Sequence, residues 1–102
     1  MSKITTRMKR HVKHVLKDEN PTIWVGKEGL TDQLISEIEK QLQKNKMVKV
    51  RVLPAALLGE TTALTIAVKA AENTNASLVE VRGHVFILFR KRKAEEKENP
   101  SL

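Results

Sequence analysis

Cysteine and tyrosine are absent from this chain of 102 residues, and Trp24, Phe86 and Phe89 are its only aromatic residues. Without cysteine the chain has no disulfide framework, no thiolate zinc site and no cysteine nucleophile, and the absence fits a cytoplasmic location. So few aromatic residues argue against a module that stacks several bases on exposed rings. No apolar run approaches the roughly 20 residues of a membrane span, and the basic segment 1–17 lacks the apolar core of a secretory signal.

Positive charge, by contrast, is abundant. Lysine and arginine number 19 against 12 aspartates and glutamates, which gives a net charge of +7 and a pI near 9.9. Such a surplus favours a polyanionic partner, with RNA, DNA and acidic membranes as candidates, although the same charge can serve solubility alone. The length allows one domain, and a hydrophobic content of 40% is sufficient to fill its core.

Hydrophobic spacing predicts a single α/β domain with the element order α-β-α-β-α-β-β and a mixed sheet. Helices are expected over residues 3–17, from the cap Thr31 to Lys46, and from about 60 to 72. Strands are expected over 23–25, 47–53, 78–81 and 85–89. The alternation in 47–53 puts Lys49 and Arg51 on a solvent-exposed face, whereas the apolar run 85–89 is typical of a central strand covered on both faces.

The first predicted helix is amphipathic and strongly basic. Its apolar positions recur at helical spacing and form one face, made of Ile4, Met8, Val12, Val15 and Leu16. The opposite face carries Lys3, Arg7, Arg10, His14 and Lys17. A face of this kind suits a phosphate backbone or an anionic bilayer, and a merely solvated surface has the same pattern. The bilayer alternative is disfavoured because the apolar face has no aromatic side chain.

The segment Gly26-Lys27-Glu28-Gly29 joins a predicted strand to a predicted helix. Glycines let another backbone approach closely, free amides and the helix dipole face the loop, and Lys27 adds a cation, all of which suit a phosphate. KH domains clamp a nucleic-acid backbone with a GxxG loop. A purely structural turn would need the same glycines, so both interpretations stay open. The spacing excludes a nucleoside-triphosphate loop.

The sequence contains no arrangement typical of catalysis or of metal binding. His11 and His14 lie three apart on the predicted helix, but no third metal ligand follows them, and His84 lies in a predicted turn. No serine, histidine and carboxylate show the spacing of a catalytic triad or a nucleophile elbow. We therefore expect a non-catalytic protein with no cofactor, no metal and no small-molecule substrate.

Three blocks, IWVGKEGLT (23–31), MVKVRV (47–52) and LVEVRGHVFILFR (78–90), resemble in order and separation the CRM domain of the YhbY-like RNA-binding proteins. The resemblance covers about residues 3–92 and indicates a domain over 1–92, followed by a charged tail over 93–102 that is expected to be disordered. It implies a fold similar to the C-terminal domain of translation initiation factor three, with a four-stranded mixed sheet in the order 1-2-4-3 and the last strand antiparallel. The family's GxxG loop maps onto Gly26–Gly29, and its hairpin glycine maps onto Gly83.

The resemblance also implies a function, because single-domain prokaryotic members are similar to factors that bind precursors of the large ribosomal subunit. We expect a cytoplasmic ribosome-assembly factor that contacts the phosphates of structured ribosomal RNA and does not bind membranes. Besides the basic helix face, the residues expected to bind RNA are Gly26, Lys27, Glu28, Gly29, Lys49, Arg51, Arg82, Arg90, Lys91, Arg92 and Lys93.

Two other functions are compatible with these observations, and one residue departs from the expected pattern. An Alba-like DNA-binding chromatin protein has a similar fold and a similar basic, cysteine-free composition. A ribosome-associated protein–protein adaptor would use the positive charge for solubility only. Glu28 puts a carboxylate where a phosphate is expected, and it either faces solvent or pairs with a neighbour.

Overall fold

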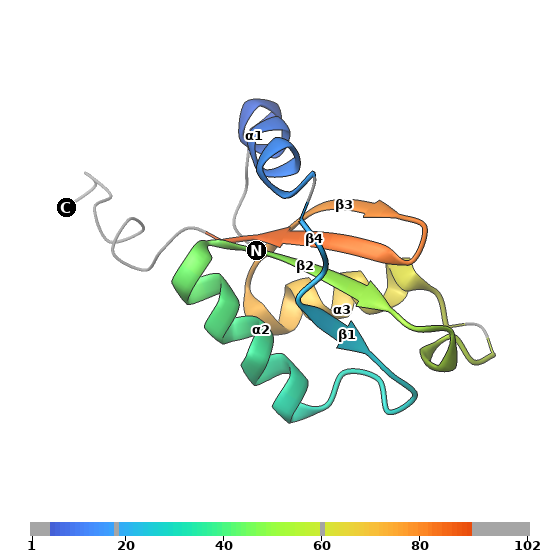
Figure 1. Cartoon of the computed structure of the whole chain (residues 1–102). Helices are drawn as coiled ribbons and strands as arrows, with labels where there is room; N and C mark the ends of the chain where they lie inside the picture. Colours follow the sequence, from blue (N-terminus) through green and yellow to red (C-terminus); the bar gives the residue numbers. More distant parts are fainter. Residues whose placement is uncertain (1–4, 18, 60, 91–102) are drawn as a thin grey trace.

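The computed structural model describes residues 5–17, 19–59 and 61–90, and Figure 1 shows the arrangement of the chain. In the described residues the helices are α1 (Thr6–Leu16), α2 (Asp32–Asn45) and α3 (Ala63–Thr74), with a short 3₁₀ helix at Pro54–Ala56. The strands are β1 (Ile23–Val25), β2 (Met47–Val52), β3 (Ser77–Arg82) and β4 (Val85–Phe89). The predicted element order and fold class are confirmed.

The strands form a mixed sheet in the order β1-β2-β4-β3. β1 runs parallel to β2, whereas β4 is antiparallel to both of its neighbours. This is the order that the family resemblance implies. β4 lies between β2 and β3, and its residues 86–89 are all buried, which confirms the prediction that the apolar run forms a central strand.

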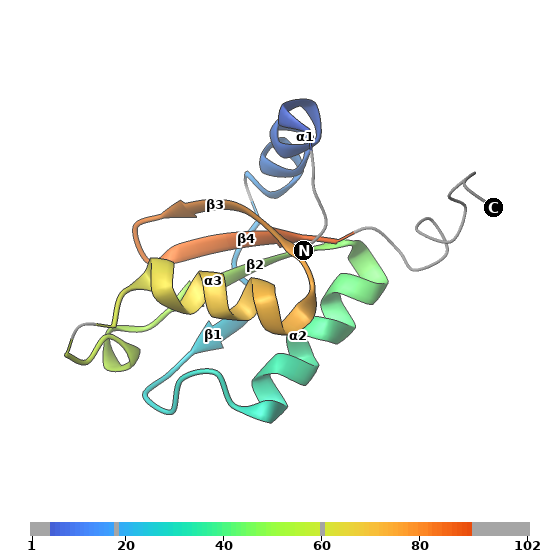
Figure 2. The ribbon, with the colours of Figure 1, turned by 180° about the vertical axis from the view of Figure 1, so that it is seen from behind.

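The larger core lies between the sheet and the helices α2 and α3, which cover the same face (Figure 2). The alternating valines of β2, Val48, Val50 and Val52, all point into this core and are at most 2% exposed. Ile38 and Leu42 of α2 pack against them from the helix side. Each such side chain contributes about 1.5–3 kcal/mol when fully buried, so this face supplies most of the driving force for folding.

α1 covers part of the opposite face of the sheet (Figure 1). Val12 and Leu16 form a small second core with Ile87 and Phe89 of β4. Met8, Met47 and Val79 surround this core. Val15 is 44% exposed, so its predicted place on the buried side of the helix is wrong. The reason is geometric, because only Val12 and Leu16, four residues apart, project directly onto β4.

Side-chain caps set the helix ends. The hydroxyl oxygens of Thr5, Thr31 and Thr62 accept hydrogen bonds from the amides of Met8, Leu34 and Thr65. α1 therefore begins at Thr6 instead of residue 3, and α3 begins at Ala63 instead of about residue 60. α2 and α3 end where Lys46 and Asn75 adopt left-handed backbone angles, with φ of 69° and 53°. α3 extends to Thr74, two residues beyond the predicted end.

Candidate nucleic-acid interface

A hollow of about 540 Å³ lies between the C-terminal half of α1 and the sheet. Its lining includes five cationic side chains and a histidine, namely Arg10, Lys13, His14, Lys17, Lys49 and Arg82. Leu16, Val85 and Ile87 contribute apolar surface, and Glu80 contributes a carboxylate. The structure thus gathers residues from three elements, α1, β2 and β3, that the sequence analysis assigned to RNA binding separately.

Lys13 belongs to this hollow although the sequence analysis did not select it. It follows Arg10 by three residues and precedes Lys17 by four, a spacing that places all three on one side of a helix. Its ammonium lies 3.2 Å from a carboxylate oxygen of Glu80 on β3. This ion pair joins α1 to the edge of the sheet, and the helical spacing was the signal that could have identified Lys13.

Lys49 has a role in the fold that the sequence did not reveal. Its ammonium donates hydrogen bonds to the backbone carbonyls of Leu16, at 3.0 Å, and Glu19, at 2.9 Å. Leu16 is the last residue of α1, where a cation is favourable because the helix dipole is negative there, and Glu19 belongs to the segment that follows the helix. Lys49 is half-buried instead of solvent-exposed, and it holds α1 on the sheet.

Arg7 does not reach the same hollow. It lines a smaller depression of about 290 Å³ on the other side of α1, together with Met8, His11, Val12 and Phe89. The predicted basic face of the helix is therefore divided, with Arg10, His14 and Lys17 on the larger hollow and Arg7 apart from them. Lys3 lies outside the described residues.

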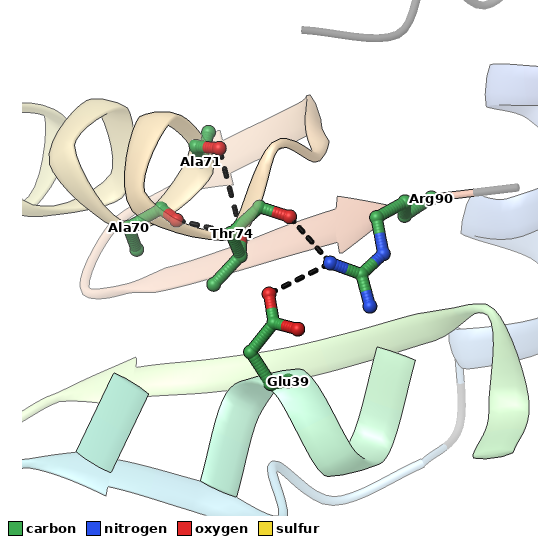
Figure 3. A network of polar contacts seen from close by, with 5 residues as sticks. All are labelled: Glu39, Ala70, Ala71, Thr74 and Arg90. Atoms are coloured by element: carbon green, nitrogen blue, oxygen red, sulfur yellow. Dashed lines mark hydrogen bonds and ion pairs between the residues drawn. The ribbon is translucent and has the colours of Figure 1, made fainter. Parts of the chain in front are cut away.

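Arg90 points to the face of the sheet that carries α2 and α3 (Figure 3). One guanidinium nitrogen donates to a carboxylate oxygen of Glu39 at 2.7 Å and to the backbone carbonyl of Thr74 at 2.6 Å. The Arg90 side chain is only 15% exposed. This placement corrects the expectation that Arg90 belongs to a basic surface, because its charge is used to join α2, α3 and the end of β4. Lys91, Arg92 and Lys93, together with the predicted tail over 93–102, lie outside the described residues.

The glycine loop forms a closed turn. The amide of Gly29 donates to the carbonyl of Gly26 at 2.9 Å, and Gly29 has a φ of +71°, which favours glycine. The expectation that all the loop amides are free is therefore wrong for Gly29. The amide of Thr31 donates in turn to the Gly29 carbonyl at 3.2 Å, so the chain turns again before α2 begins.

The two central side chains of the loop, Lys27 and Glu28, are exposed. Within the described part of the chain Glu28 has no ion-pair or hydrogen-bond partner, so its carboxylate faces solvent. Gly26 differs from Gly29, because its φ is not positive and a Cβ atom there would meet nothing within 4 Å. The fold itself does not require glycine at position 26.

The loop and the hollow lie toward opposite edges of the sheet. β1 and β3 are the two edges of the sheet, and the loop follows β1 (Figure 1). The hollow is lined by residues of β2, β4 and β3 and so reaches the other edge. Arg51 of β2 lies between the loop and the hollow, and Arg82 of β3 belongs to the lining of the hollow; both side chains are exposed. His84 is exposed in the β3–β4 turn, where Gly83 has a φ of 61°.

In the described residues no group of three or more histidine, cysteine, aspartate or glutamate side chains is placed to hold a metal ion. None of the helices described is long and apolar enough to cross a bilayer. The fold and the surface together define a small basic α/β domain with a mixed sheet and a cationic hollow under its first helix.

Comparison with known proteins assigns this domain to a family. The chain belongs to the CRS1/YhbY (CRM) domain family, whose pattern matches residues 4–90. It is 41% identical over 95 residues to the "Probable RNA-binding protein MJ0652" of Methanocaldococcus jannaschii, covering 93% of this chain and 69% of the relative. It is 33% identical over 90 residues to an "RNA-binding protein" of Haemophilus influenzae, covering 88% of each. The solution structure of the hypothetical protein SAV1595 from Staphylococcus aureus has a similar fold, with a TM-score of 0.72, 24% identity and coverage of 98% and 97%.

Proposed function

We propose that this protein is a non-catalytic RNA-binding protein of the cytoplasm, and that it holds structured ribosomal RNA by its phosphates during assembly of the large ribosomal subunit. The observation that carries the proposal is the cationic hollow, where side chains from α1, β2 and β3 converge. Both curated relatives described above are named as RNA-binding proteins. Phosphate contact is the chemistry that a cluster of lysine and arginine serves best.

Exposed cations outside ion pairs are the groups available to phosphates. Among the described lysines and arginines that were predicted to bind RNA, six are exposed and have no ion-pair or hydrogen-bond partner within the described ranges, namely Arg7, Arg10, Lys17, Lys27, Arg51 and Arg82. They spread from α1 across the open half of the sheet to the glycine loop. Such a spread suits a folded RNA that contacts several surfaces at once better than it suits a short linear segment bound in a single groove.

Salt dependence tests the phosphate mechanism. If about six phosphates are neutralised, the affinity for RNA falls by ~10³ between about 50 and 200 mM salt. Binding releases counterions from the RNA into solution, and this release becomes less favourable as the salt concentration rises. An anisotropy titration with a fragment of large-subunit ribosomal RNA, repeated at several salt concentrations, measures the slope. A nearly flat response would contradict the mechanism.

Crosslinking in a lysate of the host, followed by sequencing of the attached nucleic acid, tests the proposed target. We expect reads from the large-subunit ribosomal RNA and its precursors. Equal or tighter binding to duplex DNA at the same salt concentration would instead indicate a chromatin protein. Co-sedimentation with ribosomal particles without any binding to naked RNA would indicate a protein–protein adaptor.

A further inference from the structure

One row of residues crosses the whole sheet on the face that α1 covers only in part. The register pairs Trp24 of β1 with Arg51 of β2, Arg51 with Val85 of β4, and Val85 with Arg82 of β3. Ile23 and Val25 point into the core with α2 and α3, so Trp24 between them projects from the opposite face. With strands roughly 4.8 Å apart, the row is about 14 Å long.

Trp24 is unusual in this row because its large ring is left in solvent. It is 53% exposed, whereas its neighbours Ile23 and Val25 are at most 5% exposed. α1 packs over Ile87 and Phe89, nearer the other end of β4, and its core does not include Trp24. An exposed indole on a flat strand surface offers a π face that any base can stack on.

The charges beside the ring favour an anionic occupant. Arg51 is the direct neighbour of Trp24, and Arg82 closes the far end of the row. Both are exposed, and neither has an ion-pair partner in the part of the chain that the structure describes. Val85 and Arg82 also line the cationic hollow, so the row continues into it. At the β1 end, Trp24 lies two residues before Gly26 of the loop.

We propose that Trp24 is a base-stacking platform for an unpaired nucleotide of the bound RNA, with Arg51 beside it to hold the adjoining phosphate. This inference rests on the proposed function and adds to it a requirement for an unpaired base, which phosphate contacts alone do not impose. The row joins the glycine loop at one edge of the sheet to the hollow at the other. An unpaired segment lying along it bridges two phosphate-binding surfaces that the sequence analysis treated as separate.

The chain contains a single tryptophan, so its fluorescence reports on this site alone. We expect a single-stranded RNA oligonucleotide to quench the emission of Trp24 in proportion to binding. The same oligonucleotide annealed to its complement is expected to bind through phosphates with much less quenching. Anisotropy with the labelled oligonucleotides measures binding independently of the tryptophan.

Substitutions separate stacking from packing. Trp24→Ala is expected to weaken binding of the single strand roughly 5- to 100-fold and to change binding of the duplex little, whereas Trp24→Phe retains most of the affinity. Leu64→Ala is the matched control, because Leu64 is 55% exposed on α3, the helix that covers the opposite face of the sheet. It is expected to bind both RNAs like the parent. The melting temperature of each variant identifies any that fails to fold.

The outcomes are distinct. The stacking platform is overturned if anisotropy shows that the complex has formed but the tryptophan fluorescence is not quenched. It is also overturned if a folded Trp24→Ala variant binds the single strand with the affinity of the parent. Neither outcome contradicts RNA binding itself. Absence of binding to every RNA at low salt overturns the proposed function, and the platform with it. If Trp24→Ala does not fold, quenching of the parent and the affinity of Trp24→Phe still decide the question.

Discussion

Two glycines of one turn obey different constraints. Gly29 has a positive φ and donates the hydrogen bond that closes the turn, so the fold demands it. Gly26 has neither a positive φ nor a neighbour that a Cβ atom would strike. The folded chain alone does not account for Gly26, so a ligand that approaches the backbone closely is the explanation to be tested for a glycine there.

Alanine substitution at the two positions tests this difference. Gly29→Ala is expected to destabilise the protein by about 1–2 kcal/mol, because the Cβ atom of alanine is strained in the left-handed backbone conformation. Gly26→Ala is expected to leave stability unchanged or raise it slightly, and to weaken RNA binding through the added methyl group. Chemical denaturation and RNA titration measure the two effects. Parental RNA affinity in Gly26→Ala would show that no backbone approaches the turn at that point.

At the scale of elements, α1 depends on few contacts. Its core consists of Val12 and Leu16 on β4, and polar contacts with the sheet supplement it. Lys49 binds the carbonyl of Leu16, the last residue of α1, and that of Glu19 just beyond it, and Lys13 pairs with Glu80. Because α1 supplies much of the hollow, any loss of its docking also disperses the cationic cluster.

Lys49→Met removes the anchor while keeping the length of the side chain. We expect a loss of about 1.5–3 kcal/mol in the free energy of unfolding, the usual worth of hydrogen bonds that involve a charged group. Arg51→Met is the matched control on the same strand and the same face, and its exposed side chain predicts a change within about 0.5 kcal/mol. Equal stability of the two variants in urea denaturation would show that the contacts of Lys49 do not hold α1.

Arg90 connects elements on the other face. Arg90→Met is expected to lower stability by about 1–3 kcal/mol, because it leaves the Glu39 carboxylate and the Thr74 carbonyl without their donor. RNA affinity is expected to stay near that of the parent, because the guanidinium lies on the side of α2 and α3. Thermal denaturation and an RNA titration at one salt concentration check both. If the variant is as stable as the parent but binds RNA much more weakly, Arg90 contacts RNA after all.

The whole molecule presents two unlike faces. One is covered by α2 and α3, and the other has α1, the hollow and the open half of the sheet (Figures 1 and 2). The chain has a net charge of +7. If RNA were attracted non-specifically, the affinity would depend only on this net charge. A specific surface would depend on where the charges are.

Two double variants of equal charge distinguish these possibilities. Arg10→Glu with Arg82→Glu changes the hollow, and Lys40→Glu with Lys69→Glu changes exposed positions of α2 and α3, both lowering the net charge to +3. We expect the first to bind RNA far more weakly and to reduce the salt slope by about two, and the second to have a much smaller effect. Equal losses in the two variants would show that total charge alone governs binding.

The local pattern of the chain was sufficient for the element order and for the central position of β4. The alternation of β2, the apolar run of β4 and the cap Thr31 depend on neighbouring residues, and such short-range signals can be read along the sequence. The resemblance supplied the strand order. Val15 and the ends of α1 and α3 were misjudged, because packing against the sheet and cap geometry decide them.

The sequence by itself determined that this is a basic α/β domain of the CRM family, because composition, periodicity and the three matching blocks are properties of the chain in order. Tertiary structure decided what each charge does. Lys49 and Arg90 were both predicted to bind RNA from the sequence, yet one anchors α1 and the other joins α2 to α3. Trp24, Arg51 and Arg82 come from three strands and form one row only because pairing brings residues far apart in the chain into register. Side-chain partners of that kind depend on distance in space, which local sequence does not encode.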